Sequence, residues 1–219
     1  MGIRLKIPVI LSAAMLALSA HAGGAAESLP FMPVGSPADA PFGFTEMCAR
    51  DQILCQIGTV STRAIAHAEA GSAALLKAIN QQVNRSVVQV RDSDAMGVGE
   101  YWNRLSSDPR PVGDCEDIAI EKRIRLEQAG FPADRMFYAV AFVPRYGLHT
   151  VLVARLDDGD YVLDSMDPYI QRWDKVKYVW LRRQLPGQPL VWSRVGGENA
   201  VPEKSADVAG VAGGMGLSS

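Results

Sequence analysis

The chain has 219 residues, of which 48% are hydrophobic and 21% are charged, with 22 lysines and arginines against 24 aspartates and glutamates. This composition is ordinary for a globular protein, and it excludes a wholly disordered chain and a basic nucleic-acid-binding protein. The length suits a single domain. The three cysteines are an odd number, which in an exported protein predicts one thiol outside any disulfide.

The first 22 residues have the pattern of a signal peptide. Arg4 and Lys6 precede an apolar stretch over residues 7–20, and residues 20–22 form a small-residue cleavage site. The apolar stretch is shorter than the about 20 residues of a membrane span, so an uncleaved anchor is the less favoured alternative. We therefore expect a periplasmic or secreted protein, in a compartment where disulfides persist.

The remaining chain divides into three parts. Residues 23–41 are rich in glycine, alanine and proline and predict an extended leader. Residues 196–219 have no hydrophobic period and predict a disordered tail. Between them, residues 42–195 are sufficient for one domain with a single hydrophobic core.

The first half of this domain predicts helices. Residues 45–56 have mixed helical spacing, with Thr45 as the N-cap. Residues 72–84 form a clearer amphipathic pattern with one apolar face. Asp114 is a natural N-cap for a second long helix over residues 115–128.

The second half of the domain predicts antiparallel strands. Five β-branched or aromatic runs cover residues 136–143, 148–156, 160–164, 178–182 and 190–194. Asp158-Gly159 predicts a hairpin turn between the second and third runs. Helices followed by antiparallel strands are typical of the α+β class.

Two of the cysteines, Cys48 and Cys55, lie seven residues apart in the first predicted helix. Two full helical turns would hold their Cα atoms about 10 Å apart, which is too far for a disulfide. A bridge therefore requires the helix to break between them, for which Asp51-Gln52 is a suitable place. We favour the disulfide for an exported protein, with two reduced thiols as the alternative.

The third cysteine, Cys115, is the first residue of the second long helix. The peptide dipoles and free N–H groups at a helix start favour a thiolate, which makes the sulfur a candidate nucleophile. Asp114, Glu116 and Asp117 act in the opposite direction, so a cation must offset them, either a protonated imidazole or a metal ion. A buried, inert cysteine is the alternative interpretation.

His149 is the better candidate base of the two histidines that follow the cleavage site. His67 lies in an alanine-rich stretch, whereas His149 begins a strand after a turn, where its side chain can reach a cleft. Asp164, at the end of the next strand, is the candidate acid that orients the imidazole. A turn at residues 158–159 pairs Asp164 with Val153, however, and leaves His149 about 13 Å away along the strand. A bulge or a different register is then needed.

Several short motifs follow one another along the domain. They are GDCED at 113–117, AGFP at 129–132, LHTVL at 148–152 and VLD at 162–164, preceded by MCAR at 47–50, VNR at 83–85 and EYW at 100–102. In this order and spacing, over roughly residues 42–192, they resemble the bacterial transglutaminase-like cysteine peptidases. The resemblance implies a papain-like, transglutaminase-like α+β fold with N-terminal helices packed on an antiparallel sheet.

The resemblance also implies the chemistry. Cys115 becomes the nucleophile, His149 the general base and later acid, and Asp164 the residue that orients His149. Periplasmic proteases of the LapG type belong to this family and clip large surface adhesins, which releases biofilm cells. The implied partners are therefore a protein substrate such as an adhesin and an inner-membrane receptor.

Proteases of the LapG type need calcium at the Asp-Cys-Glu-Asp run, and the matching positions are Asp114, Glu116 and Asp117. Their hard oxygen ligands suit calcium, which would also offset the acidic cluster. In the alternative interpretation these acids only stabilise the helix N-terminus.

Two other functions remain open. A transamidase uses the same thioester as a hydrolase, and a non-catalytic periplasmic binding module could keep the same fold. The complete Cys, His and Asp set argues against the binding module. Ser165 departs from the family pattern, since many relatives have Asn after the aspartate.

Overall fold

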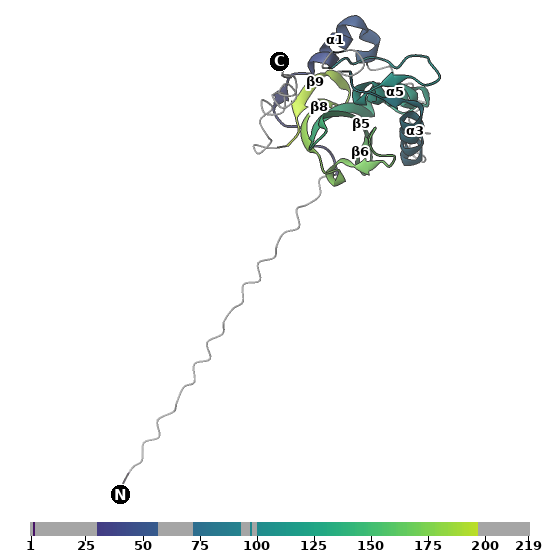
Figure 1. Ribbon diagram of the computed structural model, residues 1–219. Coiled ribbons are helices and arrows are strands. Elements are labelled where there is room, and N and C mark those ends of the chain that lie inside the picture. The colour runs from purple at the N-terminus through teal and green to yellow at the C-terminus, as the bar shows by residue number, and fades with distance from the viewer. Residues whose placement is uncertain (1, 3–29, 57–71, 93–96, 98–99, 197–219) are drawn as a thin grey trace, which may run out of the picture.

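The computed structural model describes residues 2, 30–56, 72–92, 97 and 100–196. Nearly all of the predicted signal peptide, the histidine His67 and residues 197–219 of the predicted tail lie outside this part of the chain. Within it, three α-helices and a seven-stranded antiparallel sheet confirm the predicted α+β class (Figure 1). No helix among the described residues is both long and apolar enough to cross a bilayer.

The large sheet has the strand order β1-β9-β8-β4-β5-β6-β7, with antiparallel pairing throughout. Its strands are β1 (Pro37–Ala38), β4 (Met136–Val143), β5 (Gly147–Leu156), β6 (Gly159–Leu163), β7 (Gln171–Arg172), β8 (Val179–Leu185) and β9 (Gln188–Arg194). A separate parallel pair consists of β2 (Val88–Gln89) and β3 (Val112–Gly113). The five predicted strands correspond to β4, β5, β6, β8 and β9.

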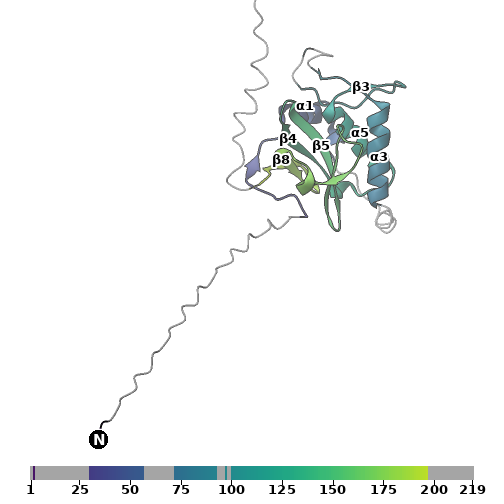
Figure 2. The ribbon, with the colours of Figure 1, turned by 60° about the horizontal axis from the view of Figure 1, so that its bottom comes forward.

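The helices cover one face of the sheet. They are α1 (Phe42–Arg50), α3 (Ser72–Ser86) and α5 (Cys115–Gln128), with short 3-10 helices η1 (Gln52–Cys55), η2 (Ala133–Arg135) and η3 (Trp173–Lys175). Figure 2 shows α3 and α5 side by side along the strands. The bounds of α3 and α5 agree closely with the helices predicted over residues 72–84 and 115–128.

Two apolar cores lie on opposite faces of the sheet, because successive side chains of a strand alternate between its faces. On β4, Tyr138 and Val140 face the core beneath the helices, whereas Phe137 and Ala139 face the second core. Met32, from the described part of the predicted leader, is buried in that second core. The segment before α1 is thus packed against the sheet.

α1 begins three residues before the predicted cap, Thr45. Pro41 occupies the N-cap position, and the Thr45 hydroxyl donates to the Pro41 carbonyl over 3.3 Å. The early start buries Phe44, whose ring meets those of Trp102, Tyr138 and Trp192 at centroid distances of 5.4, 6.3 and 5.2 Å. Burial of this ring in an aromatic cluster accounts for a helix start that Thr45 alone did not indicate.

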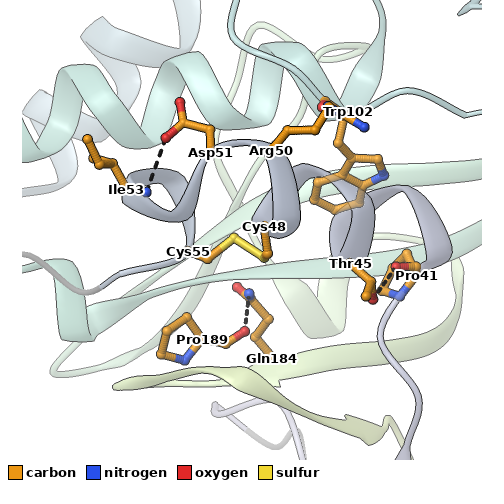
Figure 3. The surroundings of a disulfide bond; sticks show 10 residues. All are labelled: Pro41, Thr45, Cys48, Arg50, Asp51, Ile53, Cys55, Trp102, Gln184 and Pro189. Carbon is orange, nitrogen blue, oxygen red and sulfur yellow. Dashed lines mark hydrogen bonds between the residues drawn. A yellow bond between two sulfur atoms is a disulfide. The ribbon is translucent and has the colours of Figure 1, made fainter.

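The predicted break between the first two cysteines is present. α1 ends at Arg50, the backbone of Asp51 is extended, and its carboxylate accepts the Ile53 N–H over 3.1 Å at the start of η1. The break brings the Cα atoms of Cys48 and Cys55 to 5.6 Å, and the two sulfurs are bonded (Figure 3). The disulfide prediction is confirmed.

The β5–β6 hairpin has a different register from the predicted one. Leu152 pairs with Leu163 and Leu156 pairs with Gly159, so the turn residues are those at 157–158. The predicted pairing of Val153 with Asp164 is therefore wrong. Gly159 belongs to the ladder, and the Pro30 carbonyl oxygen lies 2.6 Å from the position of a Cβ there, which accounts for the glycine. The observed register brings Asp164 two residues closer to His149.

Removal of the disulfide is expected to destabilise the protein. Because the bond closes a short loop, the variant Cys48→Ala/Cys55→Ala should lose about 2.5 kcal/mol in free energy of unfolding. Urea denaturation measures this loss, and reduction of the wild type with dithiothreitol should reproduce it. Cys115→Ala serves as the control that removes a thiol but no bridge. A double variant as stable as the wild type would contradict this account.

Candidate active site

The thiol of Cys115 is buried at the start of α5, directly after β3. Gly113 ends β3, and a Cβ there would lie 2.5 Å from Cδ2 of Leu105 and 2.9 Å from Oδ2 of Asp117. The close approach of these two side chains accounts for the glycine of the GDCED motif. Asp114 occupies the N-cap position as predicted, but its side chain makes no capping hydrogen bond.

The sulfur lies against the backbone of β5. The Thr150 N–H donates to Sγ of Cys115 over 3.4 Å. Thr150 can do this because the ladder between β5 and β6 ends with Leu152 and Leu163, which leaves Thr150 beyond its last pair. His149 directly precedes Thr150 on β5, so the sulfur contacts the backbone one residue after the second predicted site residue.

The third predicted site residue contacts His149 directly. Nε2 of His149 lies 2.7 Å from Oδ1 of Asp164, and both side chains are buried. The other carboxylate oxygen accepts the Tyr178 hydroxyl over 2.6 Å, and Oδ1 also accepts the Met166 N–H over 2.8 Å. Burial alone would raise the pKa of Asp164, but the hydrogen bond from His149 and those from its other donors hold that pKa below its ordinary value.

The pairing with Asp164 determines the role of each ring nitrogen of His149. A carboxylate accepts hydrogen bonds, so Nε2 carries the proton that points at Asp164. Nδ1 is buried and has no hydrogen-bond partner among the described residues. In the neutral imidazole this nitrogen holds a free lone pair, which makes it the atom able to take up a proton.

Two tyrosines hold the imidazole in place. The ring of His149 meets those of Tyr146 and Tyr178 edge-on, at centroid distances of 5.3 and 5.8 Å. Arg91 lies over the Tyr146 ring, 5.0 Å from its centroid, and donates to the Tyr146 carbonyl over 3.3 Å. These contacts restrict rotation of the imidazole about the side-chain bonds of His149.

Four buried acids surround the start of α5. Carboxylate oxygens of Asp92, Asp114 and Asp117 all lie within 4.8 Å of one another, and ligand atoms of Asp114, Cys115 and Glu116 form a second group of the same kind. The predicted calcium ligands are therefore divided between two groups that share Asp114. Asp92, which the sequence did not indicate, completes the first group.

Burial raises the pKa of three of these acids, Asp92, Glu116 and Asp117. Burial, followed by the charge of Asp114, raises the pKa of Asp92 to about 6, and burial raises the pKa of Asp117 to about 7. Burial and then Asp114 also raise the pKa of Glu116 well above its ordinary value. Oδ1 of Asp114 is buried without a hydrogen-bond partner among the described residues. An unpartnered oxygen in a set of hard oxygen donors fits a divalent cation.

The same environment keeps the thiol protonated. Burial, and then the charges of Glu116 and Asp114, raise the pKa of Cys115 well above its ordinary value. The thiol donates to Oε2 of Glu116 over 3.1 Å. Formation of a thiolate therefore requires positive charge close to the sulfur, as the sequence predicted.

A comparison with known protein families identifies the family of this chain. The sequence model of a family described as bacterial transglutaminase-like cysteine proteinase (BTLCP) matches residues 34–200. The chain belongs to this family. It is a transglutaminase-like cysteine peptidase, as the resemblance of its motifs predicted.

Solved structures of LapG from Legionella pneumophila are similar to this BTLCP chain. The calcium-bound form is 20% identical, with a TM-score of 0.48, and the match covers 67% of this chain and 83% of that one. The EGTA-treated form is 18% identical, with a TM-score of 0.46, over 67% of this chain and 82% of that one. No curated protein matches the sequence.

The structure adds residues of this BTLCP site to which the sequence gave no role. The Asn84 side chain donates to the Asp164 carbonyl over 2.8 Å, Tyr178 donates to its carboxylate, and Lys122 lies buried on α5. Asn84 lies in the VNR motif, which contributed to the family resemblance but was assigned no function. Lys122 could have been noticed in the sequence as a lysine on an apolar helix face, seven positions after Cys115.

Proposed function

We propose that this BTLCP family member is a periplasmic peptidase that uses a Cys115-His149-Asp164 triad. The observation that carries the proposal is the 2.7 Å contact between His149 and Asp164, next to a sulfur that the Thr150 N–H contacts at 3.4 Å. Family membership supports the reaction class, and the positions of the three side chains support their roles.

In the proposed reaction, Nδ1 of His149 takes the thiol proton and the Cys115 sulfur attacks a peptide carbonyl carbon. N–H groups at the start of α5 have no partner within the helix and can stabilise the oxyanion. The imidazolium then donates its proton to the leaving amine as the C–N bond breaks. Water, activated by the neutral imidazole, attacks the thioester and releases the acid and the thiol.

Asp164 has two functions in this scheme. Its hydrogen bond with Nε2 directs Nδ1 toward the reacting proton, and its charge stabilises the imidazolium that forms. Hydrogen bonds from Tyr178 and from the Met166 N–H hold the Asp164 carboxylate in place, so that it can serve both functions in every step of the reaction. Transfer of the acyl group to an amine would use the same thioester, and hydrolysis is favoured because the family is one of proteinases.

We also propose a calcium ion at the acidic cluster. Asp92, Asp114 and Asp117 would hold it, and the positive charge that it supplies when bound would lower the pKa of the adjacent thiol. The proposal rests on the buried carboxylates of this chain and the unpartnered oxygen of Asp114. Glu116, the other predicted ligand, lies on the thiol side of Asp114.

The location and the partners are further parts of the proposal. The signal-peptide pattern of residues 1–22 supports export to the periplasm. The motifs shared with proteases of the LapG type support a protein substrate of the surface-adhesin kind and an inner-membrane receptor as a partner.

A thiol-directed probe tests the triad. With calcium present, iodoacetamide should label the wild type once and rapidly, at Cys115, and His149→Ala should slow this labelling at least about tenfold because the base is lost. His67→Ala is the matched control and should label like the wild type. Labelling of the wild type no faster than that of glutathione would contradict the peptidase and favour the binding module.

Calcium should stabilise the protein in a pH-dependent way. Without metal, the raised pKa values near 6 and 7 mean that the folded protein holds protons that the unfolded chain has released. Stability should therefore fall as the pH rises from about 4 to about 7. Calcium must displace these protons, so it should raise the melting temperature more at pH 7.5 than at pH 5.

A pair of variants locates this calcium effect. Asp92→Asn should lose most of the calcium-dependent increase in melting temperature, whereas Asp134→Asn, at an exposed position, should retain it. If EGTA and calcium give the same melting temperature at both pH values, the cluster is not a calcium site.

A further inference from the structure

A buried lysine lies between the candidate nucleophile and the acid that orients the base. Lys122 is 0% exposed on α5, two helical turns after Cys115. Its Nζ donates to the Leu163 carbonyl over 3.2 Å, and Leu163 is the last residue of β6, directly before Asp164. We propose that Lys122 is a positioning residue for the triad, which fixes the end of β6 so that Asp164 meets His149. This inference rests on the proposed function.

The local environment of Lys122 is unusual for a structural lysine. Among the described residues, no carboxylate oxygen lies within 4.0 Å of Nζ, and the Leu163 carbonyl is its one hydrogen-bond partner. A buried ammonium without a paired carboxylate is costly. Burial lowers the pKa of Lys122 to about 7, while the negative charge of Asp164 raises it. The acid of the proposed triad thus stabilises the charge of Lys122.

The backbone at the end of β6 determines where the Asp164 side chain points. The ladder with β5 stops at Leu163, so no strand partner holds the residues that follow. Lys122, from α5, binds the Leu163 carbonyl, and Asn84, from α3, binds the next carbonyl, that of Asp164, over 2.8 Å. Each long helix therefore supplies one donor to fix the chain where the ladder ends.

The hydrogen bond from Lys122 predicts a specific effect of its loss. Without this donor the Leu163 carbonyl is no longer held by α5, and the Asp164 carboxylate that follows it should meet His149 less well. The base would then be oriented less well toward the thiol. A residue that only fills space would not have this effect.

The variant Lys122→Met separates these roles. Ile118 and Leu126, one turn to either side of Lys122 on α5, are both buried, and the unbranched methionine side chain fills similar space without a charge or a donor. Lys122→Gln keeps an N–H donor but no charge. Lys77→Met, at an exposed position of α3, is the matched control.

The experiment measures the rate of Cys115 alkylation by iodoacetamide from pH 5 to 9 with calcium present, together with the melting temperature of each protein. For folded Lys122→Met we expect an at least about tenfold slower reaction at pH 7, because the base is oriented less well. Lys122→Gln should lie between this variant and the wild type, and Lys77→Met should match the wild type.

Each contrary outcome has one meaning. A folded Lys122→Met with the wild-type rate profile would overturn the inference alone. Failure of both Lys122 variants to fold would assign the lysine to stability and would also overturn it. A wild type that reacts like glutathione would overturn the proposed function and, with it, the inference.

Discussion

The end of strand β6 at Leu163 is the constraint on which the site depends. Because the ladder stops there, the Thr150 N–H is free to donate to Sγ of Cys115. The next residue, Asp164, leaves the sheet and turns its carboxylate to Nε2 of His149. The start of α5 thus meets β5 where the described residues give it no strand partner on that side, beside the His149–Asp164 pair.

Charge is the second constraint, and it opposes the first. The helix start favours an anion at Cys115, but burial and the charges of Glu116 and Asp114 raise the pKa of the thiol. The proposed reaction therefore needs positive charge close to the sulfur, from the imidazolium of His149 and from the calcium ion proposed at the acidic cluster. On this proposal the metal-free protein is less active than the calcium-loaded one.

Local patterns in the sequence predicted most of the fold. Helical and strand periodicity placed α3, α5 and the five long strands, and the odd cysteine at a helix start made Cys115 the candidate nucleophile. The predicted hairpin register was wrong: Gly159 pairs with Leu156 in the ladder and lies against the Pro30 backbone, which is far away in the sequence. Asp92 and Lys122 were missed for the same reason, since their roles arise only where separate elements pack together.

The most direct test of the account is cleavage of a protein by Cys115. The mature wild type and Cys115→Ala are incubated with calcium and the large secreted proteins of the same organism, and the new N-termini are mapped by mass spectrometry. The account predicts termini that appear with the wild type and not with Cys115→Ala. The same termini with both proteins, or none with either, would contradict it.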